Sequence, residues 1–232
     1  MKKRLAIIPA RGGSKGIPLK NIYLVNQKPL IYYSIKEALK AKELGMLDTV
    51  VVSTDSEKIA SIAKEYGADV PFLRPSNMAA DNAKSVDLMI HAIDFFRKKG
   101  QMYDDVVLLQ PTSPLRSCED ICGAINAYEK QSIPTLVSCY KEESVSEYNS
   151  YYMQNGIGIP RNVDHNKGKR RQELPELFVR NGAIFITNTE FLLEKKLVIS
   201  DNPILYIMPK ERSINIDTEY DMKLAEWMIM NA

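Results

Sequence analysis

Short apolar runs alternate along this chain with longer stretches in which apolar residues recur at helical spacing. The short runs indicate strands covered on both faces, and they lie at 4–10, 49–55, 105–110 and 134–140, with a weaker strand expected at 68–73. Helical spacing predicts helices at 29–42, 56–66, 85–99, 118–131 and 218–230. We expect Trp227 of the last helix to pack in the core. This alternation predicts an α/β fold with a doubly wound, mostly parallel sheet.

The alternation is interrupted before it resumes with apolar strands at 182–187 and 204–208. The interrupting segment, 141–181, is polar and rich in tyrosine. A structureless loop of about 40 residues is improbable in a compact domain. We therefore expect a small inserted subdomain at 141–181, with residues 1–140 and 182–232 forming the main α/β domain. The alternative is a mobile lid on a monomer.

The first apolar run opens into a glycine-rich, cationic loop at 11–21, Arg-Gly-Gly-Ser-Lys-Gly-Ile-Pro-Leu-Lys-Asn. Glycine lets the backbone turn sharply and approach a ligand closely, and exposed backbone N–H groups form a nest for anions. Arg11, Lys15 and Lys20 add charge that a structural turn does not need. The loop lacks the G-x-x-x-x-G-K-[ST] pattern of a P-loop. We expect a phosphate site here, and the alternative is a tight turn with solvated lysines.

Polar residues also follow three other predicted strands. In a doubly wound sheet, ligands bind at the edge where the parallel strands end. Arg11, Asp55, Arg74 and Gln110 each come directly after a predicted strand. We therefore expect these four residues to share one rim of the sheet.

The composition limits the kinds of partner. The chain has 232 residues and a formal net charge of +2. This balance gives no electrostatic case for binding nucleic acid or an anionic membrane, so the cations that matter must act locally. No apolar run is long enough for a transmembrane helix, and the run after the basic N-terminus is too short for a signal peptide. Three cysteines without a disulfide or metal-ligand pattern fit a cytoplasmic protein.

Five motifs, in order along the chain, resemble those of the CMP-sialic acid synthetases (N-acylneuraminate cytidylyltransferases). They are Ile-Pro-Ala-Arg-Gly-Gly-Ser-Lys-Gly at 8–16 with Lys20-Asn21, Arg-Pro-Ser-Asn-Met-Ala-Ala-Asp at 74–81, Gln-Pro-Thr-Ser-Pro-Leu-Arg at 110–116, Arg-Gln-Glu-Leu-Pro at 171–175 with Asn-Gly-Ala-Ile-Phe at 181–185, and Ile-Asn-Ile-Asp-Thr at 214–218. The resemblance implies a Rossmann-like nucleotidyltransferase that transfers CMP from CTP to the anomeric 2-hydroxyl of a nine-carbon keto acid sugar and releases pyrophosphate. It also implies a homodimer, joined by the inserted subdomain, that serves cell-surface glycan biosynthesis.

The same resemblance gives roles to individual residues. Among the residues implied in catalysis, Arg11 and Lys20 neutralise phosphate charge, and Asp217 orients the metal and helps to remove the proton of the hydroxyl. The residues implied in nucleotide binding are Arg11, Gly12, Gly13, Ser14, Lys15, Asn21, Arg74, Ala83 and Ser85. Those implied in sugar binding are Gln110, Arg171 and Phe185. Chemistry alone leaves plainer alternatives open: a surface arginine at 74, a helix N-cap at 85 and a solvated basic loop around 171.

The resemblance further implies a divalent metal, Mg²⁺ or Mn²⁺, held by two aspartates on one face of a strand. The corresponding positions here are Asn215 and Asp217, which are two apart and would share such a face. Carboxylate oxygens together with substrate phosphates suit Mg²⁺. Because asparagine removes one negative charge but keeps an oxygen, we expect Asp217 to be the main ligand. An alternative or additional role for Asp217 is to cap the helix that follows.

The motifs say less about which acid sugar is the acceptor. Gln110 and Pro111 stand where Kdo cytidylyltransferases have an acidic Gln-Gly-Asp type sequence, which argues against Kdo as acceptor. Phe185 replaces a tyrosine that sialate enzymes often carry, and Val198 with Ile199 replaces two phenylalanines. These departures point toward a 5,7-diamino acid such as legionaminate. The alternatives are pseudaminate, another acid sugar, or a homologue that binds CTP without catalysis.

Overall fold

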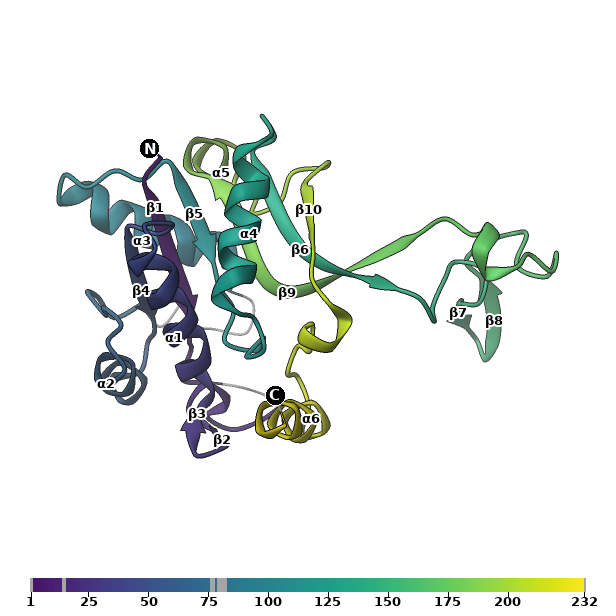
Figure 1. The fold of residues 1–232 in the computed structure, drawn as a ribbon, viewed down its shortest axis with the longest axis horizontal. Helices are drawn as coiled ribbons and strands as arrows, with labels where there is room; N and C mark the ends of the chain where they lie inside the picture. The colour runs from purple at the N-terminus through teal and green to yellow at the C-terminus, as the bar shows by residue number, and fades with distance from the viewer. Residues whose placement is uncertain (1, 14–15, 76–77, 79–82, 232) are drawn as a thin grey trace.

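The centre of the molecule is a six-stranded sheet in the order β10-β6-β9-β5-β1-β4 (Figure 1). The structure, a computed structural model, describes residues 2–13, 16–75, 78 and 83–231. The strands of the sheet are β1 (Arg4–Pro9), β4 (Thr49–Ser53), β5 (Asp105–Leu108), β6 (Thr135–Glu142), β9 (Leu177–Asn188) and β10 (Ile204–Ile207). β9 runs antiparallel to β5 and β6, and the other pairs are parallel. The prediction of a mostly parallel sheet is confirmed.

Helices cover both faces of this sheet. They are α1 (Leu30–Glu43), α2 (Glu57–Glu65), α3 (Ser85–Lys98), α4 (Cys118–Glu129) and α5 (Thr189–Lys195). Ala6 and Ile8 of β1 join a buried cluster with α1, α2 and α4, whereas Leu5 and Ile7 join a cluster with α3 and α5. Successive side chains of a strand point to opposite faces, so β1 is apolar after Arg4 because both of its faces are buried. The doubly wound arrangement is therefore confirmed.

A third, smaller cluster ties the N-terminal loop to the end of the chain. The loop contains the short 3-10 helix η1 (Lys20–Ile22) and the two-residue strands β2 (Leu24–Val25) and β3 (Lys28–Pro29), and the last helix is α6 (Glu219–Met230). Ile17 and Val25 are buried together with Ile216 and Met222. Segments from opposite ends of the sequence thus lie side by side next to the sheet.

Two local predictions are wrong. Residues 68–73 form no strand and make only single bridges beside β4, because Pro71 lacks the N–H group that a ladder needs. Trp227 does not pack in the core, since 63% of its surface is exposed. The buried face of α6 carries Met222 and Ala225 instead.

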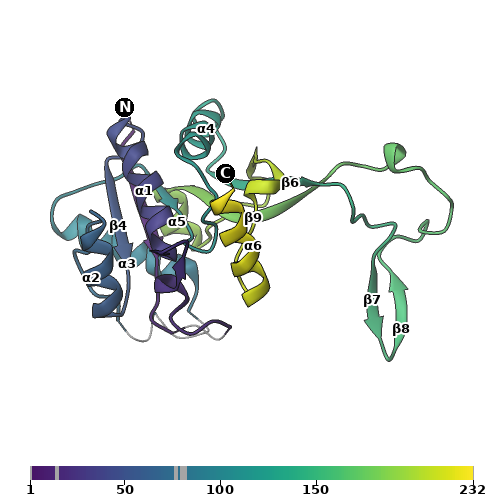
Figure 2. The ribbon, with the colours of Figure 1, turned by 60° about the horizontal axis from the view of Figure 1, so that its bottom comes forward.

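β6 and β9 continue beyond the sheet as a two-stranded arm that projects far from the body (Figures 1 and 2). Along the arm Lys141 pairs with Phe178, and Glu142 pairs with Leu177. The outer part carries the strands β7 (Tyr151–Gln154) and β8 (Ile157–Pro160), which form a hairpin, and the 3-10 helix η3 (Arg171–Glu173). The segment 141–181 is thus built on strands that continue from the sheet, and its division from the main domain stays a prediction.

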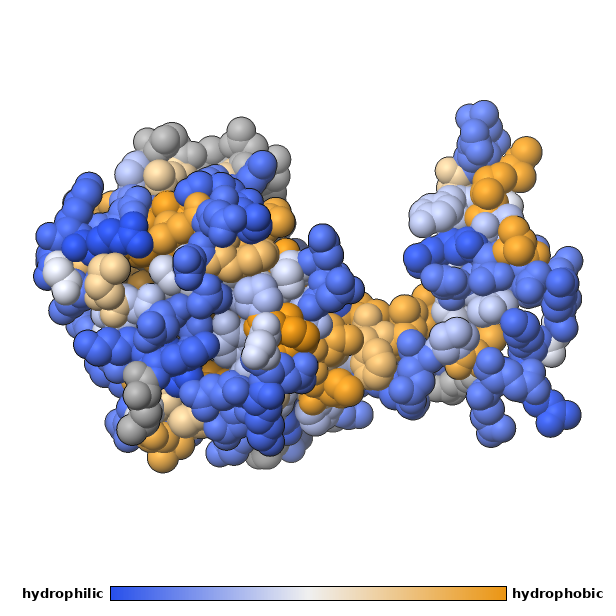
Figure 3. Space-filling model, turned by 90° about the horizontal axis from the view of Figure 1, so that it is seen from above, coloured by the Kyte–Doolittle hydropathy of each residue, from blue (hydrophilic) through white to orange (hydrophobic). Residues whose placement is uncertain are grey.

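The outer arm exposes large hydrophobic side chains. They are Tyr151, Tyr152, Met153, Ile157, Ile159 and Val163. Figure 3 shows the arm standing apart from the body, with hydrophobic side chains along the neck that joins the two. Contiguous exposed apolar surface is typical of a contact with another molecule.

The remaining expectations concern the membrane and the thiols. Nowhere in the part of the chain that the structure describes is a helix long and apolar enough to cross a bilayer. The three cysteines, Cys118, Cys122 and Cys139, are free thiols.

Candidate active site

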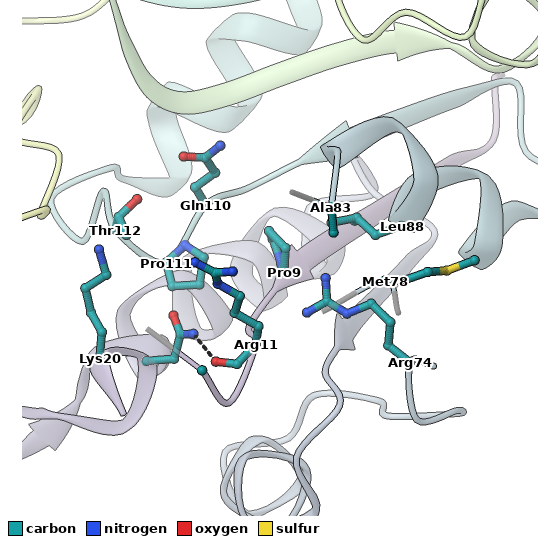
Figure 4. Close-up of a pocket in the computed structure, with 12 residues that line it drawn as sticks. Pro9, Arg11, Lys20, Arg74, Met78, Ala83, Leu88, Gln110, Pro111 and Thr112 are labelled. Carbon is teal, nitrogen blue, oxygen red and sulfur yellow. Dashed lines mark hydrogen bonds between the residues drawn. The ribbon is translucent and has the colours of Figure 1, made fainter. Parts of the chain in front are cut away.

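A cavity of about 280 Å³ opens where β1 and β5 end. It is lined by Pro9, Arg11, Gly13, Lys20, Asn21, Arg74, Met78, Ala83, Leu88, Gln110, Pro111 and Thr112 (Figure 4). The neighbours of β1 are β4 on one side and β5 on the other, so the winding of the chain reverses between β1 and β5. Doubly wound sheets bind their ligands at this kind of switch point. The prediction of one shared rim is confirmed for Arg11, Arg74 and Gln110, whereas Asp55 does not line the cavity and instead accepts from the N–H of Gly12 behind it.

The glycine-rich loop is fixed by hydrogen bonds to its backbone. The N–H of Gly12 donates to Oδ1 of Asp55 at 2.8 Å, and Nδ2 of the buried Asn21 donates to the carbonyl of Arg11 at 2.9 Å, as Figure 4 marks. A Cβ at Gly12 would lie 3.2 Å from Cβ of Ser56, so close packing favours glycine there. These contacts hold the backbone from which the side chain of Arg11 enters the cavity. Ser14 and Lys15 lie outside the described residues.

Lys20 connects this loop with the segment before α6. Its Nζ donates to the carbonyl of Ile216 at 2.7 Å and lies 3.4 Å from Oδ1 of Asp217. The loop also touches this segment at Gly16, where a Cβ would come within 2.7 Å of the carbonyl oxygen of Asp217. The ammonium group of Lys20 is thus directed to one end of the cavity by residues from the far end of the chain.

Arg74 supplies a second guanidinium to the cavity. Figure 4 shows Arg11 and Arg74 directed into the same space from different segments. Arg74 is only 6% exposed; one of its Nη atoms donates to the carbonyl of Ser53 at 3.4 Å, and its buried Nε has no partner among the described residues. Burial lowers the pKa of Arg74, Asp55 opposes this effect, and the charge of Arg11 adds to it. Two cations around one cavity, with an unsatisfied donor, favour an anionic or carbonyl-bearing ligand.

Gln110 enters the cavity beside Gly182. Gly182 has a φ of +75°, and a Cβ on it would lie 3.2 Å from Oε1 of Gln110 and 3.5 Å from Oδ1 of Asn215. Glycine adopts this backbone conformation freely, and the absence of a Cβ leaves room for the side chain of Gln110. The turn at Gly182 therefore brings together residues that follow β5 and residues that precede α6.

Asn215 and Asp217 lie next to one another, although the segment that carries them is not a strand. Nδ2 of Asn215 donates to Oδ2 of Asp217 at 2.9 Å, and the side chain of Asp217 is 70% exposed. A half turn of the Asn215 amide would bring its oxygen to the same side as the carboxylate. One or two carboxylates plus substrate phosphates suffice to hold Mg²⁺, so this donor set fits the ion. Within the described ranges, no three His, Cys, Asp or Glu side chains form a metal cluster.

Two predicted helix caps are wrong. The N-cap of α3 is Lys84, which makes no side-chain cap, and Ser85 is the first helical residue. The N-cap of α6 is Thr218, and not Asp217. Thr218 and Asp221 form a reciprocal capping box, which satisfies the helix terminus without the carboxylate of Asp217. The side chain of Asp217 therefore remains available to a ligand.

Four residues with predicted nucleotide- or sugar-binding roles do not line the cavity. Gly12 and Ser85 are absent from its lining. Phe185 pairs with Leu108 in the sheet and packs against the hydrophobic cluster of α3, because its position on β9 faces that side. Arg171 belongs to η3 in the arm. The residues with predicted nucleotide or sugar roles that line the cavity are Arg11, Gly13, Asn21, Arg74, Ala83 and Gln110.

Sequence reasoning misses two buried polar residues that hold this edge together, Arg116 and Asn181. Asn181 is 3% exposed. Its Oδ1 accepts from the hydroxyl of Ser138 at 2.6 Å and from the N–H of Ala183 at 3.1 Å, and its Nδ2 donates to the hydroxyl of Ser213 at 2.9 Å. Both residues occur in the motifs quoted above, but no local pattern separates a buried arginine or asparagine from an exposed one.

Comparison with known proteins agrees with this geometry. A model of the cytidylyltransferase family matches residues 5–217. The chain is 33% identical over 224 residues to the pseudaminic acid cytidylyltransferase of Campylobacter jejuni, which covers 97% of this chain and 95% of that protein. It is 36% identical over 224 residues to the N-acylneuraminate cytidylyltransferase of Escherichia coli, which covers 96% of this chain. The chain spans 51% of that relative, or about half its length.

A solved structure shares the fold. A CMP:2-keto-3-deoxy-manno-octonic acid synthetase complexed with CTP superimposes with a TM-score of 0.72 at 16% identity, covering 99% of each chain. At this identity the likeness shows the fold alone. Together with the family match and the relatives, it confirms the resemblance that the five motifs carry. The chain belongs to the cytidylyltransferase family of nucleotidyltransferases, alongside the N-acylneuraminate and pseudaminic acid enzymes.

Proposed function

We propose that this protein transfers CMP from CTP to the anomeric 2-hydroxyl of a nine-carbon keto acid sugar and releases pyrophosphate. The observation that carries the proposal is the cavity at the switch point of the sheet, where Arg11, Lys20 and Arg74 converge and Gln110 closes one side. A CTP-binding cavity needs cations for three phosphates and a polar group for the base. Similar proteins bear the names of enzymes that activate such acids.

The proposed reaction forms a bond between the sugar oxygen and the α-phosphorus and breaks the bond to the β-phosphate. Pyrophosphate carries away the negative charge of the leaving oxygen, so positioning and charge neutralisation supply most of the catalysis. Arg11 and Lys20 are our candidates for that neutralisation, and one well-placed donor contributes about 3–4 kcal/mol. Arg74 is placed to donate to the carbonyl of cytosine. Asp217 is our candidate to accept the proton of the attacking hydroxyl.

Asp217, with Asn215, is also our candidate to hold a divalent ion, Mg²⁺ or Mn²⁺. A bound ion of this kind would supply further positive charge to the phosphates. The residues themselves contribute orientation: Lys20 lies against one oxygen of Asp217 and Asn215 against the other. These two contacts fix the direction of the carboxylate next to Lys20, which lines the cavity.

The metal proposal predicts that excess EDTA abolishes turnover and that added Mg²⁺ restores it. Asp217→Ala is expected to lower kcat about 100-fold, because both the ligand and the proton acceptor are lost. Binding of Mn²⁺ in the presence of CTP, measured by electron paramagnetic resonance, should weaken in the same variant. Asp201→Ala, at an exposed aspartate before β10, is the matched control and should behave as the wild type. Normal turnover by Asp217→Ala would rule out both roles.

The identity of the acid is a separate proposal. Gln110 followed by Pro111 supports a nine-carbon acid over Kdo. The substitutions at 185 and 198 give no support to legionaminate in this chain, because Phe185 and Val198 pack against the α3 side of the sheet. N-acetylneuraminate, legionaminate and pseudaminate therefore remain the candidates.

Pyrophosphate release from CTP, measured with N-acetylneuraminate, legionaminate, pseudaminate and Kdo, tests the function. We expect one nine-carbon acid to be used with a kcat/KM far above that for Kdo. A second candidate function, CTP binding without catalysis, is favoured by Asn215, which removes a family carboxylate. Saturable CTP binding with no pyrophosphate from any acid, unchanged by Asn215→Asp, would support that second function and overturn the first.

We also propose that the protein acts in the cytoplasm as a homodimer joined through the arm. The exposed hydrophobic side chains of the hairpin β7–β8 support a contact between chains. The free thiols support a reducing compartment.

A further inference from the structure

Arg116 is a fully buried cation at the edge of the candidate active site. Its side chain is 1% exposed, and it immediately precedes Ser117, the N-cap of α4. A buried guanidinium destabilises a fold unless its donors find acceptors. Burial lowers the pKa of Arg116 to about 10, which leaves it charged at neutral pH. The hydrogen-bond partners of Arg116 should therefore show why a buried charge is present at this position.

The guanidinium of Arg116 joins three elements. Its Nη1 donates to the carbonyl of Ala183 at 2.7 Å and to the carbonyl of Gln110 at 3.2 Å, and its Nη2 donates to the hydroxyl of Ser34 at 2.6 Å. The hydroxyl of Ser34 in turn donates to the carbonyl of Gln110 at 3.4 Å. One side chain therefore ties the segment after β5 to β9 and to α1.

The register of the sheet explains why a side chain is needed there. In the β5–β9 ladder Asp105 pairs with Asn188 and Leu108 with Phe185, and the ladder ends at that second pair. Continued at the same register, Gln110 would face Ala183. The ladder stops before this pair, and Arg116 donates instead to both carbonyls, which in a continued ladder would accept from N–H groups of the opposite strand. Beyond the end of the ladder, the hydrogen bonds of Arg116 thus connect the segment after β5, which carries Gln110, to β9.

We propose that Arg116 is the positioning residue for the acceptor side of the active site. By holding the backbone of Gln110 and Ala183 at a fixed separation, it sets how the amide of Gln110 meets Gly182 and the cavity. This inference rests on the proposed function, in which Gln110 contacts the acid sugar.

The proposal separates the acceptor side from the nucleotide side. Arg116 donates its hydrogen bonds to Gln110, Ala183 and Ser34, none of which is a proposed CTP ligand. An error of about 1 Å in the placement of a substrate-binding group can lower a rate about 100-fold. Loss of the fork at Arg116 should therefore change recognition of the sugar and leave recognition of CTP unchanged.

Arg116→Lys is the first test, since lysine keeps the charge but lacks the planar fork that reaches three acceptors. We expect the KM for the sugar to rise about tenfold, while the KM for CTP does not change. A merely structural role would lower thermal stability and affect both substrates alike. In a Gln110→Ala background the additional effect of Arg116→Lys on kcat/KM for the sugar should vanish, because Arg116 acts through Gln110. Additive effects in this cycle would overturn the proposal.

A second readout does not depend on turnover. The side-chain amide signals of Gln110 in ¹⁵N-labelled protein are assigned as those missing from Gln110→Ala. In Arg116→Lys these signals should shift or broaden, whereas unchanged signals would overturn the proposal whatever the activity. Inactivity of the wild type with every acid would instead refute only the proposed function.

If Arg116→Lys does not fold, Ser34→Ala provides the same test with a smaller perturbation. It removes one of the three acceptors of Arg116 and leaves both carbonyls in place. We expect a rise of about threefold in the KM for the sugar, with thermal stability close to that of the wild type. No change in either the sugar KM or the Gln110 amide signals would count against the proposal.

Discussion

Lys20→Met is expected to lower kcat about 100- to 1,000-fold while the protein stays folded. Methionine keeps the length and the apolar stem of the side chain but removes its charge. The ammonium of Lys20 lines the cavity and is directed there by the carbonyl of Ile216 and by Asp217. A donor placed in advance at the phosphates is worth far more in the reaction than its ion pair with an exposed aspartate is worth in stability. Steady-state pyrophosphate release and a thermal melt measure the two effects.

Lys130→Met is the matched control for this substitution. Lys130 is exposed and caps the end of α4 that lies away from Arg116. The Lys130→Met variant should retain full turnover. A drop of less than about tenfold for Lys20→Met would show that Lys20 does not neutralise developing charge.

Gly182→Ala is expected to destabilise the protein by about 1–2 kcal/mol and to remove most of the acceptor-dependent turnover. The stability loss comes from the φ of +75°, which a residue with a Cβ adopts only under strain. The loss of activity has a different cause. The new Cβ would lie 3.2 Å from Oε1 of Gln110, which is tight enough to displace that side chain, whereas its distance of 3.5 Å from Oδ1 of Asn215 is an ordinary contact. Denaturant unfolding and the KM for the sugar measure the two effects separately.

Gly100→Ala separates backbone strain from this collision. Gly100 lies at the end of α3 and has the same φ of +75°, but no atom of the described residues lies within 4 Å of the position that a new Cβ would take. The control should lose similar stability but keep its activity. If both variants lost the same amount of activity, displacement of Gln110 would not be the cause.

The periodicity of apolar residues predicts most of the fold. Burial on both faces makes the middle of β1 and of β4 apolar, and the helices between strands carry a helical repeat, so the local sequence of each element predicts it. Pro71 shows the limit of this reasoning, since one missing donor prevents a strand between otherwise apolar residues. Trp227 shows a second limit, because which face of a helix is buried depends on the elements that pack against the helix.

Sequence reasoning predicted the parts of the site that lie in one contiguous segment better than the parts that depend on contacts between distant segments. The described residues of the loop that line the cavity, Arg11, Gly13, Lys20 and Asn21, follow a strand and lie at the switch point, as the pattern implies. The predicted roles of Ser85 and Phe185 depend on the direction of their side chains, and that direction is set by the elements that pack against α3 and β9. The contact between Lys20 and Ile216 joins opposite ends of the chain, and only packing of the third cluster brings them together.

The sequence by itself determined the class of fold, the edge at which ligands bind and the family, because these follow from local periodicity and contiguous motifs. Only the tertiary structure decided how the acceptor side is built. Gly182, Asn215 and Arg116 meet at Gln110 because the β5–β9 ladder ends before it. The hydrogen bonds and steric limits at that point depend on distances between residues far apart in the chain, and no local pattern encodes those distances.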